Sequence, residues 1–115
     1  MMKVIKKSRY KPWKYGNCVL YARRKARKFG VRLPYGLWNL RDKKKIINIS
    51  TDHPRRDVQA GDVAIMAIGR WGHVGVVYKV SKRGKVYIKE ANWRSGRRTQ
   101  RKGKQDELRI IGYYR

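Results

Sequence analysis

The fold class follows from residues 61–93, which read GDVAIMAIGRWGHVGVVYKVSKRGKVYIKEANW. Val, Ile and Tyr are concentrated in three runs, residues 62–68, 73–80 and 85–90, and Gly, Ser and Arg separate these runs. β-branched and aromatic residues favour strands, whereas glycine and small polar residues favour turns. The stretch therefore predicts three strands of a small, largely antiparallel sheet, and residues 108–114 (LRIIGYY) predict a further strand.

A helix is predicted ahead of these strands, over residues 18–29. Its apolar positions recur at helical spacing, and basic residues fill the rest of its surface. These positions are Cys18, Ala22, Ala26 and Phe29. Asn17 is a suitable N-cap and Gly30 a suitable residue beyond the C-terminus. A helical N-terminal part followed by a sheet predicts the α+β class.

The remaining segments are predicted to be less regular. Residues 1–14 form a basic N-terminal arm, and residues 33–40 form a short helix or turn that places Trp38. Residues 41–56 are polar, basic and broken by Pro54, and we interpret them as mostly loop. Residues 94–104 are basic and contain two glycines, and we interpret them as a flexible loop between the last two predicted strands. With 115 residues the chain suits one core, so we expect a single domain over residues 15–115.

Charge dominates the composition. The chain has 32 Lys and Arg against 7 Asp and Glu, a formal net charge of +25. Such a field attracts polyanions, namely nucleic acid, an anionic membrane or lipopolysaccharide surface, or the phosphate-rich polymers of a bacterial envelope. Charge alone does not choose among these partners.

The content of cysteine and histidine limits the chemistry. One cysteine excludes an intramolecular disulfide, and with two histidines it leaves too few ligands for structural zinc, so we expect no metal and no cofactor. The N-terminal residues lack the apolar run of a secretory signal peptide, and no stretch is long enough for a membrane span.

Cys18 is the candidate nucleophile. A thiol attacks as the thiolate, which the amide groups and dipole of a helix N-terminus stabilise. Taken alone, a cysteine on the apolar side of a helix is more often a small buried apolar residue. The catalytic interpretation of Cys18 therefore requires a second residue near the sulfur that can act as a general base.

The predicted hairpin supplies that base. If Val80 pairs with Lys85 across the turn at residues 81–84, His73 lies opposite Asn92 and Gly75 lies opposite Glu90. Directly opposed residues share a face of the sheet, so His73, Glu90 and Asn92 would converge. A carboxylate or amide beside the imidazole would orient it to accept a proton from the thiol. His53 is predicted to be exposed and to have no part in catalysis.

Six segments then resemble the CHAP domain family of cysteine- and histidine-dependent amidohydrolases and peptidases, within the NlpC/P60-like superfamily of papain-like fold. They are residues 16–21 (GNCVLY), 36–39 (GLWN), 61–66 (GDVAIM), 72–77 (GHVGVV), 90–93 (EANW) and 111–115 (IGYYR). The resemblance implies a papain-like CHAP fold with its groove between helix and sheet. It also implies Cys18 as nucleophile, His73 as base, Glu90 as orienting partner and Asn92 as a further polar support.

Two departures from the family pattern are visible. Members often carry Gln before the cysteine, whereas this chain has Asn17, so the oxyanion contact falls to Asn17 or to the Cys18 amide. The N-terminal arm has no acidic residue, so the calcium site of some members should be absent. Trp38, Trp71 and Trp93 are candidates to line a substrate groove, although each is equally compatible with ordinary packing.

The resemblance implies an amidase or endopeptidase that cleaves peptidoglycan through a thioester, as in a phage endolysin or virion-associated lysin. We expect a monomer that is released from the host cytoplasm to the cell wall by a holin or another route, or is carried by the virion. The alternatives are a basic nucleic-acid-binding module without catalysis and a cationic protein that disrupts envelopes.

Overall fold

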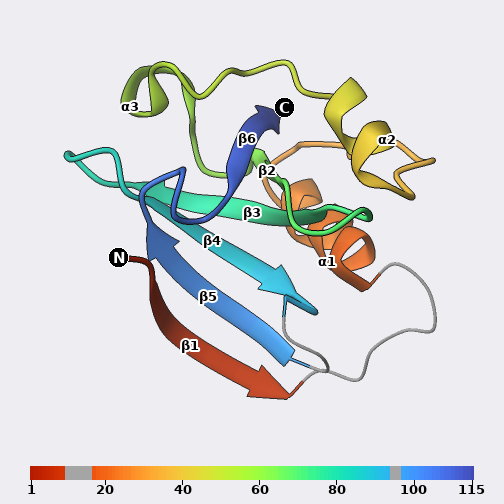
Figure 1. Ribbon diagram of the computed structural model, residues 1–115, viewed down its shortest axis with the longest axis horizontal. Coiled ribbons are helices and arrows are strands. Elements are labelled where there is room, and N and C mark those ends of the chain that lie inside the picture. Colours follow the sequence, from red (N-terminus) through yellow and green to blue (C-terminus); the bar gives the residue numbers. More distant parts are fainter. Residues whose placement is uncertain (10–16, 94–96) are drawn as a thin grey trace.

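Within the described residues, six strands form one sheet in the order β1-β5-β4-β3-β2-β6 (Figure 1). The computed structural model describes residues 1–9, 17–93 and 97–115. The elements are β1 (Lys3–Arg9), α1 (Asn17–Arg27), α2 (Leu40–Lys45), α3 (Pro54–Asp57), β2 (Val63–Met66), β3 (His73–Val80), β4 (Val86–Ala91), β5 (Arg97–Gly103) and β6 (Ile110–Tyr114). Every pairing between these strands is antiparallel. The predicted α+β class with a largely antiparallel sheet is confirmed.

The register of the β3–β4 hairpin differs from the predicted one beside the turn and matches it farther from the turn. Val80 pairs with Val86 rather than with Lys85, because the backbone of Lys85 bonds to Ser81 inside a longer turn. A bulge between Val77 and Lys79 then shifts the register back. An inserted residue moves every later side chain to the opposite face, so the bulge compensates for the error at the turn.

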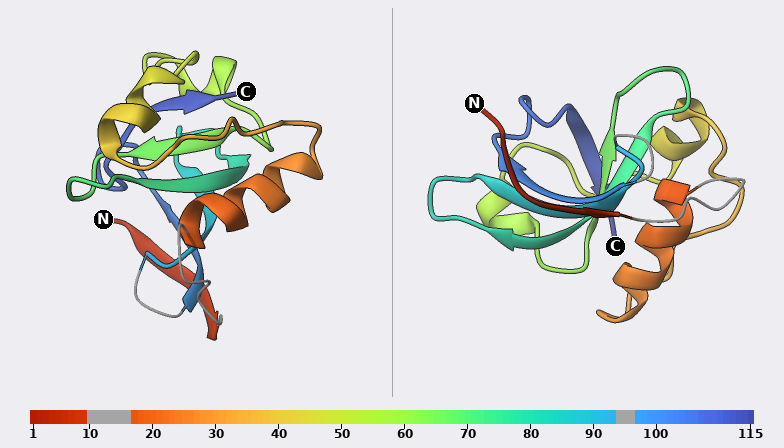
Figure 2. Two further views of the ribbon diagram at one scale, coloured as in Figure 1. Left: turned by 90° about the vertical axis from the view of Figure 1, so that its right-hand side faces the viewer. Right: turned by 90° about the horizontal axis from the view of Figure 1, so that it is seen from below.

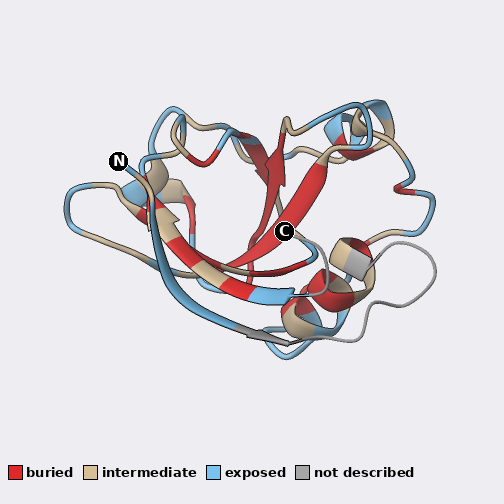
Figure 3. Cartoon of the chain, turned by 60° about the horizontal axis from the view of Figure 1, so that its bottom comes forward, coloured by how far each residue is buried: buried red, intermediate tan, exposed pale blue. Residues whose placement is uncertain are grey.

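Two strands lie where the sequence predicted none. β1 belongs to the segment interpreted as an arm, and β5 belongs to the segment interpreted as a flexible loop. Both are rich in Lys and Arg, which have low strand propensity, so tertiary pairing overrides composition. β5 is held between β1 and β4, whereas β1 is an exposed edge (Figure 3). Lysines on an edge strand discourage pairing with another chain.

α1 packs against β3 and β4 (Figures 1 and 2). Its buried stripe is Val19, Ala22 and Ala26, and these residues join the core formed on one face of the sheet. A second apolar cluster, which includes Met66 and Ile88, fills the other face. The helix is confirmed, but Phe29 lies beyond its end and is 52% exposed instead of continuing the stripe.

The segment from 33 to 56 agrees with the sequence prediction only in part. Residues 33–39 contain no helix, and α2 begins at Leu40 because Asn39 and Asp42 form a capping box. α3 is a single turn that starts at Pro54, with exposed His53 before it. The helices described span no stretch that is both long and apolar enough to cross a membrane.

Candidate active site

Cys18 lies in the first turn of α1, where the sequence placed it. The residue is partly exposed, and hydrogen bonding by the ring of His73 and by the backbone N–H of Val74 lowers the pKa of its thiol. Amide groups at a helix N-terminus favour negative charge on the sulfur. The structure therefore brings together the thiol from the helix and the imidazole from the first residue of β3.

Glu90 orients the imidazole from the far side. The Nε2 atom of His73 lies 2.8 Å from the Oε1 atom of Glu90, and both side chains are buried. Because Nε2 faces the carboxylate, Nδ1 is the ring nitrogen that faces Cys18. Gly75 lies beside this contact; a Cβ there would meet the Cβ of Glu90 at an ordinary 3.5 Å and the terminal methyl of Met66 at 3.2 Å, so the approach of Glu90 to His73 does not require glycine.

Arg101 on β5 neutralises Glu90 and was not identified from the sequence. Its guanidinium donates from Nε to Oε2 over 2.5 Å and from Nη2 to Oε1 over 2.9 Å. Arg101 is 2% exposed, and its guanidinium carbon lies 3.9 Å from the centroid of the Trp93 ring. A buried carboxylate requires such a partner. The sequence could therefore have predicted that a basic residue lies beside Glu90, but it could not show which of the 32 Lys and Arg residues this is.

These contacts shift the pKa values in the directions that favour an ion pair. Burial raises the pKa of Cys18, but the hydrogen bond from His73 and the charges of His73 and Lys43 outweigh it and lower the pKa overall. Burial lowers the pKa of His73, yet its bonds to Cys18 and Glu90 raise it overall. Burial likewise raises the pKa of Glu90, and Arg101 and His73 bring it below its ordinary value. A thiolate facing an imidazolium is therefore favoured.

Lys43 is a second basic residue that the sequence analysis missed, because its segment was interpreted as a loop. It is 2% exposed, and its Nζ donates to the carbonyl oxygens of Leu37 at 3.0 Å, Trp38 at 3.3 Å and Trp71 at 2.8 Å. Burial lowers the pKa of Lys43, while the charges of Cys18 and Asp42 oppose that shift. The amine thus joins two loops beside the thiol and adds positive charge there.

Replacing Lys43 by methionine is expected to lower the free energy of unfolding by about 2 to 3 kcal/mol, because three carbonyl groups lose a buried donor. It should also raise the pKa of Cys18, since a positive charge near the thiolate is removed. Chemical denaturation measures the first effect, and the rate of iodoacetamide alkylation against pH measures the second. Lys44→Met, at the exposed next residue, is the matched control. An alkylation profile unchanged in Lys43→Met would contradict this role.

Asn92 is not part of the group. It follows the end of β4, is exposed and has a left-handed backbone with φ of 60°, and its N–H donates to the carbonyl oxygen of Arg97. Among the hydrogen bonds of the described residues, none joins its side chain to His73. The left-handed turn takes Asn92 out of the strand alternation on which its predicted position depended. The side chain of Asn17 lies outside the described residues, so its oxyanion role stays a prediction.

The three tryptophans lie around these groups in different ways. Trp38 and Trp71 are 70% and 58% exposed, and their carbonyl groups share the amine of Lys43. Trp93 is half-buried against Arg101. A small, mainly apolar pocket of about 130 Å³ lies between α1 and residues 35–38. It is lined by Val19, Leu20, Arg23, Tyr35, Gly36, Leu37 and Trp38. The exposed ring of Trp38 therefore lines a pocket that adjoins the turn of α1 after Cys18.

Comparison with known proteins gives one match. A family model described as CHAP domain matches residues 6–92, a range that includes Cys18, His73 and Glu90 but ends before Arg101. No curated protein and no solved structure matches the chain. In the part of the chain that the structure describes, no group of three or more His, Cys, Asp or Glu residues could hold a metal ion.

Proposed function

Since the chain belongs to the CHAP domain family, which comprises peptidoglycan amidases and peptidases, we propose that it hydrolyses an amide bond of peptidoglycan with Cys18 as nucleophile. The observation that carries this proposal is the continuous chain of contacts from Cys18 through His73 and Glu90 to Arg101. A nucleophile, a base and a group that orients the base are the parts that covalent amide hydrolysis requires.

The proposed reaction begins with attack of the Cys18 thiolate on the amide carbon, which forms a carbon–sulfur bond and a tetrahedral oxyanion. The His73 imidazolium donates its proton to the leaving nitrogen as the carbon–nitrogen bond breaks, which leaves a thioester. Water then gives a proton to neutral His73 and attacks the thioester carbon. Cleavage of the carbon–sulfur bond returns the thiolate and the imidazolium and releases the product as a carboxylic acid, which loses its proton to water or to the released amine.

The first residues of α1 are the candidates for stabilising the oxyanion. The backbone N–H of Cys18 lies at the helix N-terminus, where amide groups lack intrahelical acceptors. Asn17 was the side-chain candidate from the sequence. On the substrate side, exposed Trp38 and Trp71 are suited to bind glycan or stem peptide beside the thiol.

Digestion of purified peptidoglycan tests the proposal. Mass spectrometry of the released fragments should show new amino groups with intact glycosidic bonds, and the fragment masses identify the amide cleaved. This separates the two forms of the activity, an N-acetylmuramoyl-L-alanine amidase and an endopeptidase of the stem or cross-bridge. Fragments with new reducing sugar ends, or no fragments at all, would contradict it.

We further propose that the enzyme acts as a lysin of the phage endolysin or virion-associated type, at the bacterial cell wall. The net charge of +25 supports this, because anionic envelope polymers would concentrate the protein on its substrate. The same charge also supports the alternative of non-specific nucleic-acid binding. A protein that binds DNA but leaves peptidoglycan intact would establish the alternative.

A further inference from the structure

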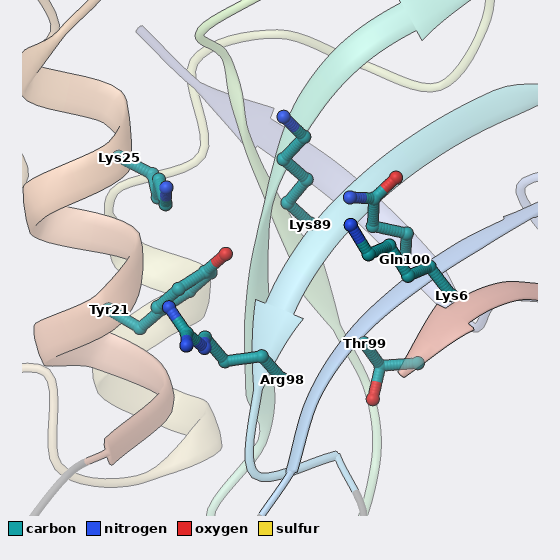
Figure 4. A pocket seen from close by; sticks show the side chains of 7 residues that line it. All are labelled: Lys6, Tyr21, Lys25, Lys89, Arg98, Thr99 and Gln100. Atoms are coloured by element: carbon teal, nitrogen blue, oxygen red, sulfur yellow. The ribbon is translucent and has the colours of Figure 1, made fainter. Parts of the chain in front are cut away.

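A cationic pocket of about 280 Å³ lies between α1 and the strands β1, β4 and β5 (Figure 4). Figure 4 shows Tyr21 and Lys25 extending from α1 toward the strands, and Arg98 reaching from β5 toward the helix. The lining residues are Lys6, Tyr21, Lys25, Lys89, Arg98, Thr99 and Gln100. None of them takes part in the contacts of Cys18, His73 and Glu90 described above.

The register of the sheet accounts for the floor of this pocket. Gln100 pairs with Lys6 on one side and with Lys89 on the other, so the three residues form a row across β1, β5 and β4. Directly opposed residues point to the same face of a sheet. The row therefore presents an amide between two ammonium groups, and all three side chains can donate hydrogen bonds to one bound group.

The described residues that line the pocket include four basic side chains and no carboxylate. All seven Asp and Glu residues lie in the described part of the chain, and none of them lines the pocket. Lys25 and Lys89 instead contact the faces of Tyr21 and Tyr78, at 5.6 Å and 5.1 Å from the ring centroids. Burial lowers the pKa of Lys25, and the charges of Lys28, Lys89 and Arg98 lower it further. Electrostatic repulsion between these like charges thus raises the free energy of the empty pocket, and a bound anion would reduce that repulsion.

We propose that this pocket binds a phosphate group of an anionic polyol-phosphate polymer of the bacterial envelope, which holds the enzyme beside its peptidoglycan substrate. The choice of a polymer that accompanies peptidoglycan depends on the function proposed above. Phosphate suits the site because several ammonium groups and a guanidinium can share its oxygens and its charge. The α1 residues of the pocket, Tyr21 and Lys25, are about one and two helical turns along the helix from Cys18, so the bound polymer would lie on the same helix as the nucleophile.

The lining favours a phosphate chain without bases. Single-stranded nucleic acid is bound by basic grooves in which aromatic side chains stack on successive bases. Among the described residues that line this pocket, Tyr21 is the one aromatic residue, and it is buried with Lys25 against its ring. These described residues therefore offer contacts to phosphate oxygens and no exposed ring for a base.

The test is calorimetric titration of the full chain with a short poly(glycerol phosphate), with inorganic phosphate and with a single-stranded oligonucleotide at equal ionic strength. In the variant Lys25→Gln/Lys89→Gln, affinity for poly(glycerol phosphate) should fall about tenfold or more, since two charge-assisted contacts are lost. The control Lys82→Gln/Arg83→Gln removes the same charge from the exposed β3–β4 turn and should bind as the wild type does. Weak binding of inorganic phosphate that is lost in the same variant would locate the phosphate itself in the pocket.

Three outcomes overturn the proposal: an equal loss in both variants, which would mean general surface charge; a loss confined to the oligonucleotide, which would mean a nucleic-acid site; and unchanged binding in both variants. Circular dichroism and thermal melting check that the variants are folded. Hydrolysis of polymer-free peptidoglycan by the wild type is measured separately. Its absence would refute the proposed function, whereas binding of poly(glycerol phosphate) is read independently of hydrolysis.

Discussion

Replacement of Cys18 by alanine is expected to reduce hydrolysis of purified peptidoglycan by a factor on the order of 10⁴ to 10⁶. The sulfur atom forms the thioester, and no other cysteine exists in the sequence to replace it. Affinity for peptidoglycan and for anionic polymers should stay unchanged, because the charge of the Cys18 thiolate is balanced by the His73 imidazolium and Cys18 does not line the cationic pocket. Turbidity clearing and fragment release measure the first quantity, and sedimentation with insoluble peptidoglycan measures the second.

Chemical modification gives an independent check with the natural sequence. Because Cys18 is the sole cysteine, iodoacetamide should add one mass increment and abolish clearing in parallel with its incorporation. Alkylation should remain fast at pH values below the ordinary pKa of a thiol, since His73 and Lys43 lower the pKa of Cys18. Clearing by Cys18→Ala at the wild-type rate would exclude Cys18 as the nucleophile.

Replacement of Arg101 by methionine is expected to lower the free energy of unfolding by about 3 to 5 kcal/mol, because it leaves the Glu90 carboxylate buried without a counter-charge. It should also alter the pH dependence of activity. The pKa of Glu90 would rise without Arg101, and a protonated Glu90 no longer stabilises the imidazolium of His73. The pKa of His73 would therefore fall, and the alkaline limit of activity would move to lower pH.

Two further variants separate these effects of Arg101. Arg97→Met, at the exposed first residue of β5, removes the same charge and should change neither the free energy of unfolding nor the pH profile. Combining Arg101→Met with Glu90→Gln should restore part of the lost stability, because the unpaired charge is removed, but it should not restore activity. Chemical denaturation and pH–rate profiles measure both. An Arg101→Met protein as stable as Arg97→Met would show that Glu90 does not depend on the arginine.

The sequence was most informative where side-chain pattern and chemistry coincide. In residues 73–90 the apolar runs predict the two strands, and the polar residues His73 and Glu90 stand at the ends of these runs away from the turn. The prediction that His73 and Glu90 lie together was therefore correct. It was correct only because the bulge after Val77 cancels the one-residue error in the predicted turn. That compensation depends on backbone geometry, which periodicity does not contain.

The residues missed by sequence reasoning are basic ones whose burial depends on distant partners. Arg101 and Lys43 look like the other Lys and Arg residues of the chain until the fold places Glu90 and three carbonyl groups beside them. β1 and β5 were missed for a related reason, since their Lys-rich and Arg-rich sequences are stable as strands only through neighbouring strands. Non-local contacts therefore account for most of the differences between prediction and structure.

The position of Arg101 affects how this domain can be transferred into chimeric proteins. A fragment cut at the boundary of the family match, residue 92, would keep the nucleophile and the base but lose the guanidinium that neutralises the core carboxylate. It would also lose β6, whose buried Tyr113 closes the sheet beside β2. A functional transplant therefore has to include residues 97–115, and fusion partners are better joined after Arg115 than within β5.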